Sequence, residues 1–146
     1  MDGIFEFLKK NKVFTTLVII AVIFVAMYCF DYVRAKNYEI EVVSISPEEP
    51  VADGETPVYI TIKLTRGGNP VEGHYMYILP INGGTMQKNR AQTDQNGCVE
   101  YIYYPYRASV LMPAQTVTLR VYDESNSVFV IVNANLDFEI DLKEAV

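Results

Sequence analysis

The chain of 146 residues has no tryptophan, only two cysteines and a single histidine. Two cysteines cannot form a disulfide framework; Cys29 and Cys98 are unpaired packing residues, or Cys98 forms an intermolecular bridge. His74 has no companions at metal-ligand spacing and no serine or cysteine nucleophile in a matching motif. These shortages predict a non-enzymatic protein with no catalytic residue, no metal, no cofactor and no small-molecule substrate.

Basic residues are also in short supply, with 12 lysines and arginines against 18 aspartates and glutamates. The imbalance lies almost entirely after residue 30, where nine basic residues face sixteen acidic ones. An acidic domain repels phosphate backbones, so the composition argues against a nucleic-acid partner.

The longest uncharged stretch covers residues 13–30, eighteen positions without proline or glycine. At about 1.5 Å per helical residue it is roughly 27 Å long, close to the hydrocarbon thickness of a bilayer. We therefore predict a transmembrane helix over residues 13–32 that contacts membrane lipid. Its lack of ionisable side chains within the run argues against an ion path. The predicted anchor residues are Val13, Leu17, Ile20, Phe24 and Phe30.

Three lysines, Lys9, Lys10 and Lys12, precede this run. By the positive-inside bias they predict a cytoplasmic basic segment over residues 1–12, followed by the helix, a juxtamembrane linker over 33–39 and an extracellular domain over 40–146. The competing interpretation is a cleaved signal peptide. The run is long for a signal-peptide core, and no small-x-small cleavage pattern follows it.

Beyond the helix, apolar residues alternate with polar ones along the stretches 39–42, 58–65, 117–122 and 136–142. Period-two alternation indicates strands with one buried and one wet face. Glycine-rich and asparagine-rich turns separate them at short spacing, and no helical stretch is visible. The pattern predicts an all-β antiparallel sandwich of seven to eight strands. Residues 128–132 are apolar throughout, which predicts a central strand covered on both sides or a strand near a partner.

Three segments carry a family resemblance: 54–64, 68–74 and 93–101. They read as a glycine-containing loop with an alternating strand, a G-x-P-V-x-G turn, and a T-D-x-x-G-x-V strand. This order resembles the bacterial Ig-like domains of the invasin and intimin type, over roughly residues 40–142. The resemblance implies an Ig-like sandwich. It does not carry over an adhesin role, because invasin-type proteins string such domains in tandem on an outer-membrane barrel.

Within the third segment, individual positions have predicted roles. Gly97 supplies a positive φ that closes a turn, and Asp94 bonds the backbone amides of that turn. In this register Val99, Tyr101 and Tyr103 face inward.

The tyrosine-rich stretch 101–106 and the apolar loop after it form the most suggestive surface. Tyrosine is enriched at interfaces, and an exposed apolar loop often marks a partner surface. The alternative is that these tyrosines only fill the core and cover the loop. The acidic turn 123–127 has enough oxygens for calcium but lacks EF-hand spacing. The residues predicted to bind a protein partner are Ile102, Tyr104, Tyr106, Arg107, Val110, Leu111 and Met112.

The leading functional hypothesis is a single-pass membrane protein whose Ig-like domain mediates protein–protein interaction or assembly at the prokaryotic cell surface. A pilin-like or stator-like subunit of a surface filament or secretion machine is the second hypothesis, although the cleavage-site residue and early glutamate of pilins have no match. A carbohydrate-binding adhesin is the third, weakened by the lack of tryptophan.

Overall fold

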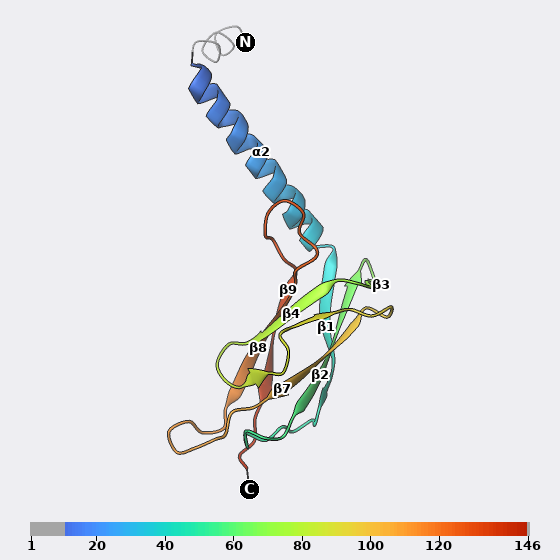
Figure 1. The fold of residues 1–146 in the computed structure, drawn as a ribbon, viewed down its shortest axis with the longest axis vertical. Coiled ribbons are helices and arrows are strands. Elements are labelled where there is room, and N and C mark those ends of the chain that lie inside the picture. Colours follow the sequence, from blue (N-terminus) through green and yellow to red (C-terminus); the bar gives the residue numbers. More distant parts are fainter. Residues whose placement is uncertain (1–10, 146) are drawn as a thin grey trace.

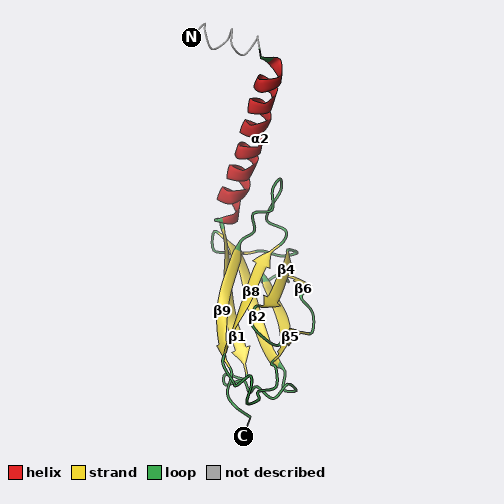
Figure 2. Cartoon of the chain, turned by 90° about the vertical axis from the view of Figure 1, so that its left-hand side faces the viewer, coloured by secondary structure: helices red, strands yellow, loops and turns green. Residues whose placement is uncertain are grey.

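The computed structural model describes residues 11–145, in which one long helix extends from one end of a β-sandwich (Figures 1 and 2). Helix α2 spans Lys12–Ala35. Most of the predicted basic segment 1–12 lies outside the described residues. We refer to residues 38–145 as the head. Its strands are β1 (Tyr38–Ser46), β2 (Val58–Arg66), β3 (Asn69–Pro70), β4 (Tyr75–Pro80), β5 (Thr85–Met86), β6 (Arg90–Gln92), β7 (Cys98–Tyr104), β8 (Thr116–Asp123) and β9 (Asn135–Asp141).

The strands form two antiparallel sheets. One has the order β1-β2-β7-β5, with β3 pairing with β2, and the other has the order β6-β4-β8-β9. Of the nine strands in the described range, β3 and β5 have two residues each. The predicted antiparallel β-sandwich is therefore confirmed, with these two short strands added to seven longer ones.

Alternation along the strands builds the core between the sheets. In β2 the side chains of Val58, Ile60, Ile62 and Leu64 are all 0% exposed, and β4 and β8 present their own aliphatic residues from the opposite sheet. Burying each such side chain contributes about 1.5–3 kcal/mol. The Tyr101 hydroxyl on β7 donates to the Met76 carbonyl oxygen on β4 at 2.8 Å, which links the two sheets and satisfies a buried phenol.

The turn before β7 has the predicted chemistry. Gly97 has φ +73°, and its own N–H donates to the Asp94 carbonyl oxygen at 2.9 Å. The Asp94 carboxylate accepts the N–H groups of Asn96 and Cys98, both at 2.8 Å. Val99, Tyr101 and Tyr103 face inward as predicted, with at most 5% exposure.

Helix α2 is long and apolar enough to cross a membrane, and its most apolar stretch has no residue buried against the head. Val13, Leu17, Ile20, Phe24 and Phe30, the predicted anchor residues, are each more than 40% exposed. The helix is therefore a candidate membrane anchor.

The predicted linker over residues 33–39 is not a separate segment. Helix α2 continues to Ala35, a two-residue turn follows, and β1 begins at Tyr38. Ala35 and Tyr38 are both only 7% exposed. The last helical residue and the first residue of β1 are thus both buried.

The strand predicted over residues 128–132 is wrong, because this segment is a loop. The N–H groups of Val128 and Phe129 donate to the Asp31 carboxylate of α2, at 2.9 and 2.7 Å, and the Val130 N–H does the same. The Asn126 side chain closes the loop by donating to the Val132 carbonyl oxygen at 2.9 Å. These partners replace the neighbouring strand that a sheet would supply.

Candidate functional site

The residues predicted to bind a partner lie on one strand and on the loop that follows it. Ile102 and Tyr104 are half-buried on the outer face of β7. Ile102 pairs with Tyr59 of β2, which is 53% exposed, and Tyr104 pairs with Thr85 of β5. The other five residues belong to the loop 105–115, which connects β7 to β8 at the end of the head away from α2 (Figure 1).

The base of the loop 105–115 is held on the segment 52–55. The Ala108 N–H donates to the Ala52 carbonyl oxygen at 2.8 Å, and Arg107 Nε donates to the Asp53 carbonyl oxygen at 3.0 Å. Arg107 also forms an ion pair with Glu55. Arg107 is thus an exposed brace, and its role in positioning the loop was not anticipated from its sequence.

The carboxylate of Asp53 organises the segment beneath that loop. It accepts hydrogen bonds from the Thr56 hydroxyl and from the N–H groups of Glu55 and Thr56, the last two at 2.8 Å. The Thr56 hydroxyl bond and then the two backbone bonds lower the pKa of Asp53 to about 2, because all of them favour the ionised form. The Asp53 carboxylate is therefore ionised across the physiological range.

Tyr106 and Met112 fold back toward the head. The Tyr106 hydroxyl donates to the Pro113 carbonyl oxygen at 2.7 Å and closes the loop on itself. A β-carbon on Gly83 would lie 2.9 Å from Cδ1 of Tyr106 and 3.5 Å from Cε of Met112, so both side chains cover the Gly83 turn. Tyr106 is accordingly half-buried, with its ring against the Gly83 turn and its hydroxyl bonded within its own loop.

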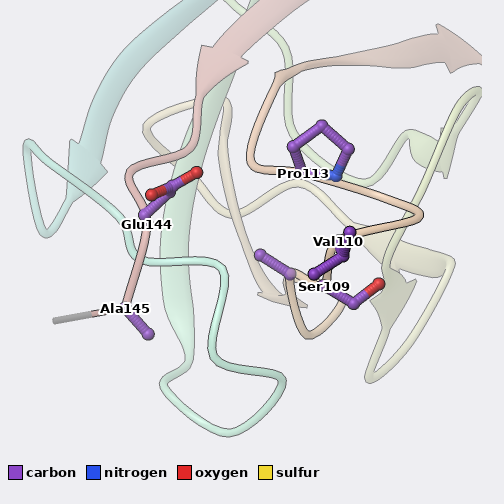
Figure 3. A pocket seen from close by; sticks show the side chains of 6 residues that line it. Ser109, Val110, Pro113, Glu144 and Ala145 are labelled. Carbon is purple, nitrogen blue, oxygen red and sulfur yellow. The ribbon is translucent and has the colours of Figure 1, made fainter.

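The tip of the loop is apolar and unshielded. Ser109 and Met112 exchange backbone hydrogen bonds at 2.9 and 3.1 Å, which leaves Val110 and Leu111 at the turn. These two side chains are 101% and 97% exposed. Beside them is a shallow hollow of about 310 Å³ that continues to Glu144 and Ala145 near the C-terminal end (Figure 3).

A buried histidine–aspartate pair was missed from the sequence. His74 lies just before β4, and its Nδ1 is 2.7 Å from Oδ2 of Asp123, whose side chain is fully buried. The other oxygen of Asp123 accepts the Ser125 N–H at 2.8 Å. Glu124 of the same acidic turn forms an ion pair with Arg90. The oxygens of the turn therefore bond within the fold, and the His74 ring is a hydrogen-bond partner of the buried Asp123 carboxylate.

A second missed residue is Asp31, the first charged residue after the apolar run. It is 0% exposed and bonds a loop that follows almost a hundred positions later. The sequence carries one signal for this role, which is the position of the carboxylate at the end of a predicted membrane span. A charge that becomes buried there needs hydrogen-bond partners.

No protein-family model matches the chain, and no curated protein matches it. Among solved structures, the D00-D0 domain of intimin aligns with 72% of this chain at a TM-score of 0.52 and 12% identity, and 48% of that structure is covered. The head has the fold of an intimin-type bacterial Ig-like domain.

Two further solved structures align with lower TM-scores. The D0-D1 domain of intimin gives a TM-score of 0.49 at 18% identity, covering 74% of this chain and 50% of that one. A conjugative transposon lipoprotein from Bacteroides eggerthii gives 0.44 at 18% identity, covering 70% and 95%. The chain spans about half the length of the two intimin fragments.

The Ig-like head places two apolar loops at opposite ends. The loop 105–115 lies at the far end, and the loop 126–134 lies beside the end of α2 (Figure 1). The register of β8 with β9 determines this arrangement, since Thr116 pairs with Asp141 at one end and Tyr122 with Asn135 at the other.

Proposed function

We propose that the protein is a non-enzymatic, single-pass membrane protein of the prokaryotic cell surface, with α2 in the membrane and its N-terminal end in the cytoplasm. The Ig-like head stands outside the cell and binds a protein partner through the tip of the loop 105–115, as an assembly subunit or a small adhesin.

The observation that carries this proposal is the exposure of two adjacent aliphatic side chains, Val110 and Leu111, at 101% and 97%. An unshielded aliphatic pair costs solvation free energy in a free monomer, and burying it in a partner recovers about 25 cal/mol per Å². The hydrogen-bonded base of the loop supports the same role, because a tip that is already ordered loses less entropy on binding.

The test is site-specific photo-crosslinking of the full chain in its native membrane. We expect a photoreactive phenylalanine analogue in place of Leu111 to give a discrete protein adduct. The matched control carries the same analogue in place of Glu100, which is exposed in the middle of β7. No adduct at 111, or the same adducts at both positions, would contradict the proposal.

A double substitution, V110D with L111D, checks the chemistry of the tip, with the photoreactive analogue placed at Ser109. The adduct should disappear because charges replace the apolar contact. Both side chains are exposed, so the free energy of unfolding should change by less than about 0.5 kcal/mol, and loss of the adduct cannot be assigned to unfolding.

A further inference from the structure

The loop 126–134, here the juxtamembrane loop, lies beside the C-terminal end of α2 in both views of the chain (Figures 1 and 2). Its ring contact with the helix is direct, because Phe129 meets Phe30 edge-on with ring centroids 5.5 Å apart. Phe30 is the last residue of the uncharged run 13–30. The loop is thus level with the point at which the apolar part of the helix ends.

Part-buried polar contacts hold the juxtamembrane loop on the helix. The Asp31 carboxylate accepts the N–H groups of Val128, Phe129 and Val130. Arg34, one turn further on, donates from Nε to the Asn126 carbonyl oxygen at 2.7 Å. The loop is held at two points and cannot swing away from α2 without breaking these bonds.

The surface that this arrangement turns outward is apolar. Val128, Phe129 and Ile131 are 56%, 53% and 87% exposed, and no residue from 126 to 135 is charged. The N–H groups of residues 128–130 already have Asp31 as their acceptor. Backbone groups of an ordinary loop need water, whereas these can leave water without losing a partner.

The neighbouring helix surface has the composition of a membrane interface. Tyr28 and Tyr32 are 50% and 43% exposed and stack on each other at 6.1 Å, and Lys36 lies over the Tyr32 ring at 4.5 Å. Tyrosine rings gather at the headgroup level of membranes, where one side is apolar and the other wet. A span of about 27 Å from residue 13 brings this level to the edge of the hydrocarbon.

We propose that the juxtamembrane loop is a second membrane contact, with Val128, Phe129 and Ile131 inserted among the lipid headgroups and upper acyl chains of the outer leaflet. The inference rests on the proposed function, in which α2 spans the bilayer. Helix and loop together then support the head at two points and fix its tilt above the membrane.

The lack of tryptophan makes single-tryptophan reporters possible. The full chain is reconstituted in vesicles of phosphatidylcholine and phosphatidylglycerol, with and without brominated acyl chains. We expect Ile131→Trp to emit at shorter wavelength than free tryptophan and to lose intensity with brominated lipid. Leu111→Trp, at a similarly exposed position at the far end of the head, is the matched control and should lose none.

A third reporter, Phe24→Trp in the middle of α2, separates the two proposals. Quenching of Phe24→Trp with none of Ile131→Trp, whose emission then resembles that of Leu111→Trp, would overturn the second contact and leave the anchor standing. Absence of quenching at Phe24→Trp would overturn the anchor itself. Emission from Ile131→Trp that is shifted but unquenched would mean that the side chain is buried against protein, which also overturns the lipid contact.

Discussion

At the scale of the residue, the buried polar side chains of this protein hold distant segments together by hydrogen bonds. Among residues 11–145 no buried side-chain nitrogen or oxygen lacks a hydrogen-bond partner. Asp31, Asp123 and Asn126 are each fully buried, and each bonds a segment distant from its own element or closes a loop. Leaving such a group without its partner costs about 1–3 kcal/mol, so each one restricts where the chain can go.

The buried phenol of Tyr103 provides a prediction for alkaline pH. Its hydroxyl donates to the Gly83 carbonyl oxygen at 3.0 Å, and burial, with a smaller effect of Tyr106, raises its pKa to about 12. In the unfolded chain the pKa is about 10. Because the folded value is higher, the stabilisation is complete below about pH 10 and is lost as the pH rises towards about 12.

The measurement is a series of urea titrations in mild detergent across this pH range. We expect a level free energy of unfolding below about pH 10 and a decline above it. Tyr103→Phe should make the decline shallower. Burial also raises the pKa of Tyr101, so part of the decline stays in that variant. A free energy that stays level up to about pH 12 would contradict the assignment.

At the scale of the element, turns determine which strands can meet. A β-carbon on Gly97 would collide with the Leu64 carbonyl oxygen, so the β7 turn approaches the end of β2 more closely than any other residue permits. Gly68, in the turn between β2 and β3, has a similar φ of +80° but open space around it. At Gly68 only the backbone conformation favours glycine. At Gly97 the same conformational preference is joined by a lack of space for a β-carbon.

Alanine substitution at each glycine tests this difference. Gly68→Ala should lower the free energy of unfolding by about 1–2 kcal/mol, the cost of a left-handed conformation for a residue with a β-carbon. Gly97→Ala should lower it clearly further, because the collision adds to the same conformational cost. Denaturant titration measures both variants, and equal losses would show that the close approach relaxes freely.

The loop 126–134 shows at this scale how a strand signal can mislead. Five consecutive apolar residues, 128–132, have the composition of a central strand. Their backbone groups bond a carboxylate 97 to 99 positions earlier in the chain instead of a neighbouring strand. The apolar composition of a segment indicates a strand, but it carries no information about which distant group accepts the backbone hydrogen bonds.

At the scale of the whole molecule, helix and head form a continuous rod with contacts across the junction (Figure 2). The Asp31 and Arg34 bonds and the Phe30–Phe129 contact join α2 to the head beyond the covalent connection. A flexible linker would allow the head to tumble above a membrane. This junction predicts instead a head that keeps one orientation relative to its helix.

Spin labels measure that orientation. In a chain with Cys29 and Cys98 replaced by serine, labels at Val25→Cys on α2 and Tyr59→Cys on β2 should give one narrow distance distribution. Asp31→Ala should broaden it, because three backbone N–H groups lose their acceptor. Asp137→Ala, which removes an exposed carboxylate paired with Arg120, is the control and should leave the distribution narrow. A broad distribution in the unsubstituted junction would contradict the rigid coupling.

Much of the fold followed from local rules. The alternation in β2, the Asp94–Gly97 turn and the inward side of β7 all depend on neighbours within a few residues, and each was predicted correctly. The predicted partner surface stays a prediction, and its residues differ in their surroundings. Val110 and Leu111 form an exposed tip, whereas Tyr106 and Arg107 hold the loop in place. Whether a side chain braces or binds depends on what the folded chain brings beside it.

The sequence by itself determined the elements of this protein: an apolar helix, an alternating all-β head, and the turns that join its strands. These follow from hydrophobic period and backbone preference, which act over short distances along the chain. Tertiary structure alone decided that the loop 126–134 would meet the helix at Asp31, that His74 would face Asp123, and that the two apolar loops would lie at opposite ends. Such contacts join residues up to about a hundred positions apart, and they exist only once the sandwich has closed.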